Sequence, residues 1–179
     1  DQPLPIKESY TPNPLSPYGL HKLMGEQYCR LFNHLFKLET VCLRYFNVFG
    51  PRKLPSGSYP MVIPIFLDQR QKGQKLTIVG DGTATRDYVY VSDVVEANIK
   101  AWQSAVGDGR AINIGSGKQI SVNEIAKLVG GPTVNIPPRP GEMKFIAADA
   151  SLAKQLLGWE PKVSFEEGIK MLKKEWGVE

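Results

Sequence analysis

Residues 16–22 read Ser-Pro-Tyr-Gly-Leu-His-Lys, and residues 40–52 read Thr-Val-Cys-Leu-Arg-Tyr-Phe-Asn-Val-Phe-Gly-Pro-Arg. The first stretch predicts the start of a helix, because Pro17 suits a first turn, where its missing N–H costs nothing. Apolar residues keep a helical rhythm from there to about Lys37. In the second stretch, Thr40 to Tyr45 reads as a mostly buried strand that runs into a loop punctuated by Gly and Pro. A helix followed by a buried strand is typical of an α/β protein.

The rest of the chain continues this alternation of helices and strands. Two capping boxes, Ser121–Glu124 and Ser164–Glu167, indicate helix starts, and Asp149 is predicted to cap a helix that ends at Gly158. We therefore predict an α/β fold without internal repeats. Helices are expected over residues 17–37, 61–72, 92–105, 121–129, 149–158 and 164–176, and strands over 40–45, 75–79, 87–91, 111–114 and 133–136.

Size and composition narrow the class of protein. The 179 residues, 42% of them hydrophobic, suit one domain, or a domain with a small additional lobe. The net charge of +4 comes from scattered residues without a basic run interleaved with aromatics, which argues against a nucleic-acid surface. An apolar stretch of membrane-spanning length is absent, and the opening Asp-Gln-Pro-Leu-Pro is not a signal peptide.

The cysteines and histidines offer little chemistry. Cys29 and Cys42 lie in apolar runs and are expected to be buried free thiols in a reducing compartment, so we predict a cytoplasmic protein. Together with His21 and His34 they make no ligand cluster, and we predict no metal site.

Tyr18 and Lys22 are the first candidates for catalysis. Residues four apart lie above one another on the same face of a helix. A neighbouring ammonium favours the phenolate form of a phenol, which can then take a proton from an alcohol. Lowering the pKa of a phenol from about 10 to roughly 7 requires about 4 kcal/mol, which one close cation in a dry site can supply. On this spacing alone, a surface lysine beside a helix tyrosine explains the pair equally well.

The start of the chain lacks a feature that α/β cofactor-binding proteins carry there. No Gly-rich turn follows a strand in the first forty residues, and the chain opens in a Pro-rich loop that leads directly into a helix. We expect the chain to be the C-terminal part of a larger α/β protein.

With these segments in place, the chain resembles the extended short-chain dehydrogenase/reductase family, specifically its NAD-dependent nucleotide-sugar epimerases and dehydratases. The resemblance covers nearly the whole chain and rests on several motifs in order. They are Y-x-x-x-K within S-P-Y-G, L-R-Y-F-N-V-F-G-P-R, G-D-G-T-A-T-R-D-Y-V-Y-V-S-D-V, I-N-I-G-S-G, and P-R-P-G-E followed by A-D-A-S-L-A-K-Q-L-L-G-W-E-P.

The resemblance implies a two-part fold, of which this chain would be the C-terminal part of a Rossmann-like fold plus a small α/β substrate-binding lobe. Residues 1–50 would be the tail of the Rossmann half, with the Tyr/Lys helix and the following strand. Residues 51–179 would form mainly the nucleotide-sugar-binding lobe, with some segments returning to the Rossmann half. The cofactor would be NAD, in a site left incomplete because the family's glycine loop is missing from this sequence.

The resemblance also implies roles for residues near the Tyr/Lys helix. Tyr18 would remove the proton from the 4-hydroxyl of the sugar, and Lys22 would bind the nicotinamide ribose. Phe46, with Tyr45, would lie near the nicotinamide, although both could equally be core aromatics. Asn47 would bond the sugar or the diphosphate.

Further residues are implied in substrate binding. Arg86 and Arg139 would bind phosphate through their planar guanidinium groups, with a surface salt bridge as the alternative for each. Asp87 is expected to anchor its loop rather than to contact the substrate. The backbone of Thr77 and Val79 would run along the uracil ring. Val62 would lie near the sugar and pyrophosphate, and Ile146 would occupy a position that gates N-acetylated sugars.

The activity implied is that of a UDP-sugar 4-epimerase acting on UDP-glucose and UDP-galactose, as a homodimer when full length. One alternative is a nucleotide-sugar 4,6-dehydratase or decarboxylase of the same family. Another is a non-catalytic fragment that binds a nucleotide sugar or mediates dimerisation. Leu31, Leu35 and Phe36 could serve in a dimer's helix bundle, although packing against the sheet explains them as well.

Overall fold

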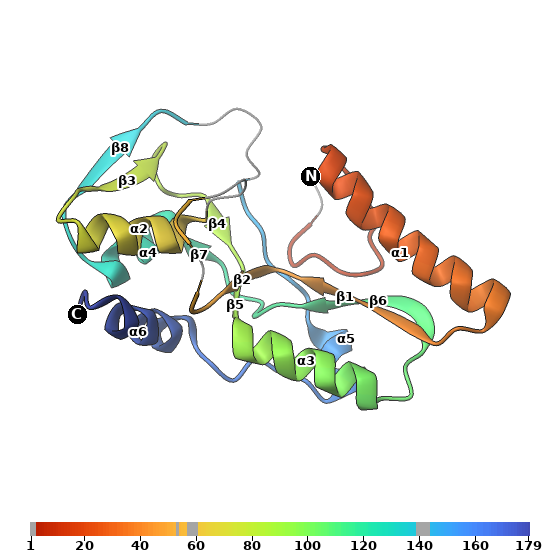
Figure 1. The fold of residues 1–179 in the computed structure, drawn as a ribbon. Coiled ribbons are helices and arrows are strands. Elements are labelled where there is room, and N and C mark those ends of the chain that lie inside the picture. The colour runs from red at the N-terminus through yellow and green to blue at the C-terminus, as the bar shows by residue number, and fades with distance from the viewer. Residues whose placement is uncertain (1–2, 53, 57–60, 139–143) are drawn as a thin grey trace.

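The computed structural model describes residues 3–52, 54–56, 61–138 and 144–179. Arg139, one of the two predicted phosphate ligands, lies outside the described residues. The elements form two neighbouring groups, each around a hydrophobic core, and a long helix lies at one edge of the molecule (Figure 1). The prediction of a mixed α/β fold is confirmed.

Helix α1, Pro17–Phe36, forms close to the predicted bounds. The Ser16 hydroxyl accepts a hydrogen bond from the Gly19 N–H at 3.1 Å, and Pro17 occupies the first turn. Lys37 ends the helix in the left-handed conformation.

The apolar residues of α1 remain exposed. None of the helix's 20 residues is buried. Leu31, Leu35 and Phe36 are 47%, 56% and 67% exposed. Packing against the sheet within the described part of the chain therefore does not account for their apolar character.

The first core surrounds two parallel strands. Strand β1, Thr40–Tyr45, pairs in parallel with β6, Asp108–Ile114. Helix α1 lies on one side of this pair, and α3, Val91–Gln103, and α5, Ser151–Leu157, lie on the other (Figure 1). The most deeply buried members of this core include Ile112, Ile114 and Trp159.

The second core is built from short strands and three helices. Phe66, Leu76, Ile125 and Phe165 are among its buried residues. The helices are α2, Val62–Gln71, α4, Val122–Val129, and α6, Phe165–Trp176. The strands are β2, Asn47–Phe49, parallel to β5, Tyr88–Tyr90; β3, Leu76–Val79, parallel to β8, Thr133–Ile136; and β4, Thr85–Arg86, antiparallel to β7, Ile120–Ser121.

One run of chain joins the two cores. Strands β1 and β2 are separated only by Phe46, whose N–H donates to the Ile114 carbonyl at 3.0 Å, whereas the next N–H, that of Asn47, donates to the Asp87 carbonyl at 2.9 Å. Within two residues, the hydrogen-bonding partner of this run of chain thus changes from β6 to β5. Because the carboxyl ends of parallel strands are where ligands of α/β proteins bind, this change of partner marks the place to look for a site.

Some sequence-based boundaries were wrong. Strands β2, β4 and β7 were not predicted, because two- and three-residue strands carry no periodic pattern. Helix α5 begins at Ser151, with Ala150 rather than Asp149 in the capping position. The Asp149 carboxylate still accepts a hydrogen bond from the Ser151 N–H at 3.0 Å. Hydrogen bonding with the Ser151 side chain, and secondarily with this N–H, lowers the pKa of Asp149.

The two thiols are free, as predicted, but they are half-buried rather than buried. Cys42 lies on β1 and Cys29 on α1, at the contact between the two elements. Burial, together with a hydrogen bond to Cys29, raises the pKa of Cys42 to about 12.

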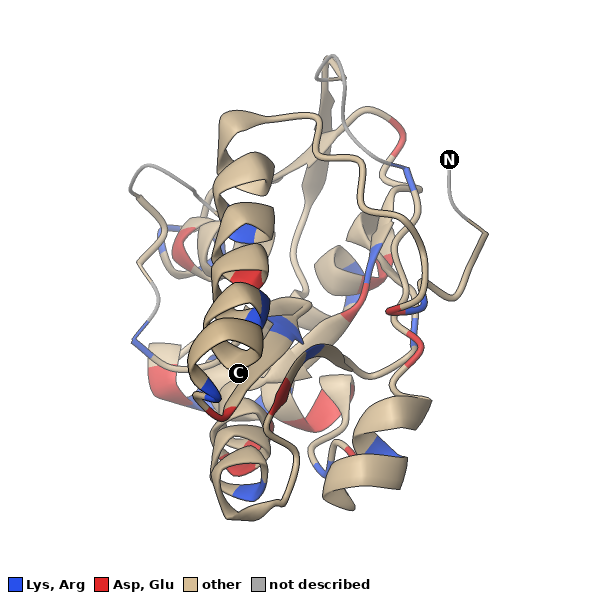
Figure 2. Cartoon of the chain, turned by 90° about the vertical axis from the view of Figure 1, so that its right-hand side faces the viewer, with Lys and Arg blue, Asp and Glu red and all other residues tan. Residues whose placement is uncertain are grey.

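Charged residues are spread over the molecule. Lys and Arg alternate with Asp and Glu along the visible helices and strands (Figure 2). Among the described residues, no helix combines the length and the apolar character that crossing a membrane would require.

Candidate active site

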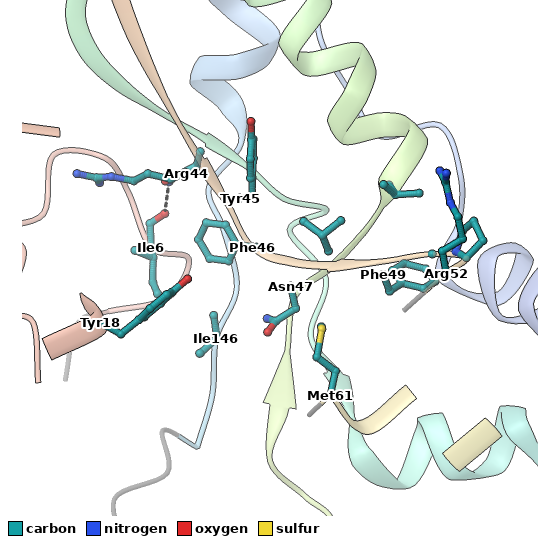
Figure 3. A pocket seen from close by; sticks show the side chains of 15 residues that line it. Ile6, Tyr18, Arg44, Tyr45, Phe46, Asn47, Phe49, Arg52, Met61 and Ile146 are labelled. Carbon is teal, nitrogen blue, oxygen red and sulfur yellow. Dashed lines mark hydrogen bonds between the residues drawn. The ribbon is translucent and has the colours of Figure 1, made fainter. Parts of the chain in front are cut away.

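A cavity of about 680 Å³ opens where β1 passes into β2. Side chains from six parts of the chain surround it: the N-terminal segment, the first turn of α1, the β1–β2 run with the loop after it, the start of α3, β6, and the segment that precedes α5 (Figure 3). Its size falls in the range of small-molecule sites. The lining residues include Ile6, Tyr18, Arg44, Tyr45, Phe46, Asn47, Arg52, Met61, Asn113 and Ile146.

Tyr18 lies at the edge of this cavity, in the first turn of α1. Its hydroxyl points toward the space between Phe46 and Ile146 (Figure 3). The Lys22 ammonium lies 5.4 Å from the centre of the Tyr18 ring, so the two groups are neighbours, as their spacing predicts. Tyr18 is 67% exposed. The described residues therefore do not supply the dry surroundings that proton abstraction by a phenolate would need.

Arg44 and Glu26 fix α1 against β1. The guanidinium donates to both carboxylate oxygens, Nε to Oε1 at 2.8 Å and Nη2 to Oε2 at 2.7 Å, in a bidentate pair that is only partly exposed. This hydrogen bonding is the main reason that the pKa of Arg44 is raised. Glu26 lies one helical turn after Lys22, so the pair sets where the Tyr/Lys face of α1 lies. Nothing in the sequence signals a pair between residues on two separate elements.

Asn47 begins β2 at the floor of the cavity. Its side-chain Nδ2 donates to the Asp87 carbonyl at 3.1 Å, and its main-chain N–H donates to the same oxygen. The side-chain amide lies between Ile146 and Met61 (Figure 3). One hydrogen bond from the side chain and one from the main chain, both to the same carbonyl, hold Asn47 at the cavity.

Tyr45 and Phe46 point in opposite directions, as neighbours in an extended chain do (Figure 3). The Phe46 ring lies on the side of Tyr18 and Ile146. The Tyr45 hydroxyl donates to Oδ1 of Asn98 on α3 at 2.8 Å, which directs the phenol away from Tyr18.

Four further predicted ligands that the structure describes, Val62, Thr77, Val79 and Arg86, are not among the residues that line the cavity. Val62 follows directly after the lining residue Met61. The N–H and the hydroxyl of Thr77 are both bonded to the side chain of Gln69, at 3.1 and 2.9 Å. Arg86, on β4, donates from Nη1 to the Thr85 carbonyl at 2.8 Å. Val79 ends β3 in the second group of elements.

Several lining residues were not predicted from the sequence. Ile6 is fixed by hydrogen bonds from its N–H to the Ala147 carbonyl and from the Asp149 N–H to its own carbonyl, both between distant segments. Asn113, 1% exposed, donates to the carbonyls of Ile6 and Asp149. Arg52 has a positive φ of 63°. That conformation, uncommon for a residue with a side chain, is a signal that only the structure reveals.

A model of one protein family matches residues 1–115. Its description is "NAD dependent epimerase/dehydratase family". The chain belongs to this family. The resemblance inferred from the motifs is thereby confirmed.

Individual relatives agree with the family. The chain is 39% identical to UDP-glucose 4-epimerase from Mycolicibacterium smegmatis, over 92% of this chain and 54% of the relative. It superposes on the UDP-glucose 4-epimerase of Thermotoga maritima, solved with UDP-glucose, with a TM-score of 0.90 and 41% identity, over 99% of this chain and 58% of that one. For UDP-glucuronic acid 4-epimerase from Bacillus cereus, solved with UDP-glucuronic acid and NAD, the TM-score is 0.83 and the identity 35%, over 97% of this chain and 55% of that one. The chain thus spans about half the length of these relatives.

The described residues fit one end of NAD, the family's cofactor. The phenol of Tyr18 and the ring of Phe46 line one side of the cavity, and the Lys22 ammonium lies beside the Tyr18 ring. Such groups suit a ribose and a nicotinamide ring. By contrast, the described residues contain no group of three or more His, Cys, Asp or Glu placed to hold a metal ion.

Proposed function

We propose that this chain is the tyrosine-bearing part of an NAD-dependent UDP-sugar 4-epimerase that interconverts UDP-glucose and UDP-galactose. The observation that carries the proposal is the position of Tyr18, with Lys22 beside it, facing a cavity at the carboxyl end of β1. Relatives named as UDP-glucose 4-epimerases, matched over nearly all of this chain, support the choice of reaction.

In the proposed reaction, Tyr18 takes the proton of the sugar 4-hydroxyl as that alcohol becomes a ketone, and returns it when the alcohol re-forms. NAD, when bound, accepts the hydride from C4 and later supplies it to the opposite face of the sugar. Lys22 holds the cofactor ribose and favours the phenolate. Phe46 provides an apolar wall, and Tyr45 supports it through its bond to Asn98 on α3.

The proposed substrate extends from the cavity toward the second group of elements. Asn47 and Ile146 contact the sugar beside Tyr18. Val62, which follows the lining residue Met61, lies near the sugar and pyrophosphate. Beyond them, Arg86 and Arg139 bind the diphosphate, and the backbone of Thr77 and Val79 accompanies the uracil.

The same proposal assigns the elements to two parts. Residues 1–50 belong to the cofactor-binding half and residues 51–179 mainly to the nucleotide-sugar lobe, with some segments returning to the first half. The full-length protein would be a homodimer, with the exposed apolar residues of α1 in the contact.

A second candidate is a non-catalytic fragment that binds the nucleotide sugar without turnover. The exposure of Tyr18, 67%, favours it, because the described residues leave the proton-transfer group open to water. A dehydratase or decarboxylase on the same fold is a further alternative, since one relative, 36% identical, is a UDP-N-acetyl-alpha-D-glucosaminuronate decarboxylase.

The test is conversion of UDP-galactose to UDP-glucose by the purified chain with NAD added, beside calorimetric binding of UDP-galactose. We expect Tyr18→Phe to lower any turnover by at least about 100-fold, because the substitution removes the proton-transfer group and leaves the ring. Its effect on binding should be small. Binding without turnover would favour the non-catalytic candidate, and turnover that Tyr18→Phe leaves unchanged would refute the proposal.

A further inference from the structure

Asp87 is the most deeply buried acidic residue of the described chain, at 0% exposure. Its carboxylate accepts hydrogen bonds from four neutral donors. Oδ1 accepts from the N–H and the hydroxyl of Ser116, both at 2.7 Å. Oδ2 accepts from the N–H groups of Gly117 and Ala148, both at 2.9 Å. A buried carboxylate costs free energy unless such partners replace its water.

These donors come from two segments that border the cavity. Ser116 and Gly117 lie two and three residues after the end of β6, whose residue Asn113 lines the cavity. Ala148 follows two residues after Ile146, which faces Tyr18 (Figure 3). The carboxylate therefore joins the end of β6 to the segment that places Ile146.

The main chain of Asp87 adds a third segment. Its carbonyl accepts both the N–H and the side-chain Nδ2 of Asn47, at 2.9 and 3.1 Å. One residue thus holds Asn47 with its backbone and the Ile146 segment with its side chain.

The packing around the carboxylate leaves no room for adjustment. A Cβ on Gly115 would lie 2.6 Å from the Ala148 Cβ, 2.9 Å from the Asp87 Oδ2 and 3.2 Å from the Phe46 Cγ. Glycine is needed here because of this close approach and not because of its backbone conformation. A side chain at position 115 would therefore also press against the ring of Phe46.

We infer that Asp87 is a positioning residue for the sugar end of the site, which it assembles by holding Asn47 and the segment that carries Ile146 in one arrangement without contacting the ligand. This inference rests on the proposed function. It goes beyond anchoring a loop, because it ties ligand affinity to a single buried carboxylate.

The test is Asp87→Asn, with Asp93→Asn as the matched control. An asparagine has one acceptor oxygen, so its NH₂ group would face N–H donors that have lost their acceptor. Asp93 is also buried, at 3% exposure, and its Oδ2 accepts a hydrogen bond from the Val163 N–H at 3.0 Å, away from the cavity. Both variants should lower the melting temperature.

Affinity for UDP-glucose, measured by calorimetry at a temperature where both variants keep the native circular dichroism spectrum, separates positioning from stability. We expect Asp87→Asn to weaken binding by at least about tenfold, whereas Asp93→Asn should change it by less than about twofold. Hydrogen exchange provides a readout without ligand: the Ser116 and Ala148 amides should lose protection in Asp87→Asn and keep it in Asp93→Asn.

Equal affinities of Asp87→Asn and the wild type would overturn the inference while leaving the proposed function intact. Equal weakening in both variants would also overturn it, because a general loss of stability would then explain the effect. A wild-type chain that does not bind UDP-glucose would instead contradict the proposed function, and the inference with it.

Discussion

Arg44 and Glu26 show how a single pair of residues can position the helix face that carries Tyr18 and Lys22. Their bidentate bond joins β1 to α1 one turn beyond Lys22. We expect Glu26→Gln to lower the free energy of unfolding by about 1–2 kcal/mol, because a partly buried guanidinium loses its charged partner. Urea unfolding measures the change.

The matched control for that variant is Asp68→Asn. Asp68 of α2 and Lys72, the residue that caps this helix, form an i and i+4 pair with the nitrogen and oxygen 2.8 Å apart, in which the lysine side chain is 57% exposed. Breaking it should change the free energy of unfolding by less than about 0.5 kcal/mol. Equal losses in the two variants would show that the Arg44–Glu26 pair is no stronger than a surface pair.

At the scale of one element, the capping box of α4 couples helix stability to pH. The Ser121 hydroxyl accepts from the Glu124 N–H at 3.1 Å and donates to the Glu124 carboxylate, and this bond lowers the pKa of Glu124. A carboxyl group whose pKa is lower in the folded than in the unfolded protein adds stability at pH values above its unfolded pKa. This stability is lost as the pH falls through its folded pKa.

We therefore expect Ser121→Ala to lower the free energy of unfolding by about 1 kcal/mol at neutral pH, and by less at an acid pH well below the ordinary glutamate pKa of about 4.3, because the contribution of the lowered pKa is lost as the pH falls. Urea unfolding at both pH values checks this. Ser92→Ala, at an exposed serine in the first turn of α3, is the control. A loss independent of pH would show that the carboxylate plays no part in the cap.

At the scale of the whole molecule, strand β5 contributes side chains to both hydrophobic cores. On β5, Tyr88 belongs to one core and Val89 to the other, because neighbouring residues of a strand point to opposite faces. We expect a single unfolding transition in urea, with tryptophan fluorescence and far-UV circular dichroism coinciding. Two separated transitions would mean that the cores are independent.

The same scale shows what a sequence can and cannot predict. The starts of α4 and α6 follow from Ser121 and Ser164, because a capping box is complete within four residues. Strand β7 has two residues and forms only because β4 lies beside it. Among site residues, the place of Asn47 follows from the end of a strand, whereas the donors to Asp87 come from positions up to 61 residues away.

The exposed apolar side chains of α1 affect how the protein should be handled. Tyr28, Leu31, Phe32, Leu35 and Phe36 are each at least 44% exposed while the helix itself is fully formed. Hydrophobic dyes bind such surfaces, and their fluorescence is commonly used to recognise partly unfolded states that have lost tertiary packing. For this chain, dye fluorescence would be a property of the folded protein, so sample quality is better judged from the near-UV circular dichroism of its buried aromatic residues.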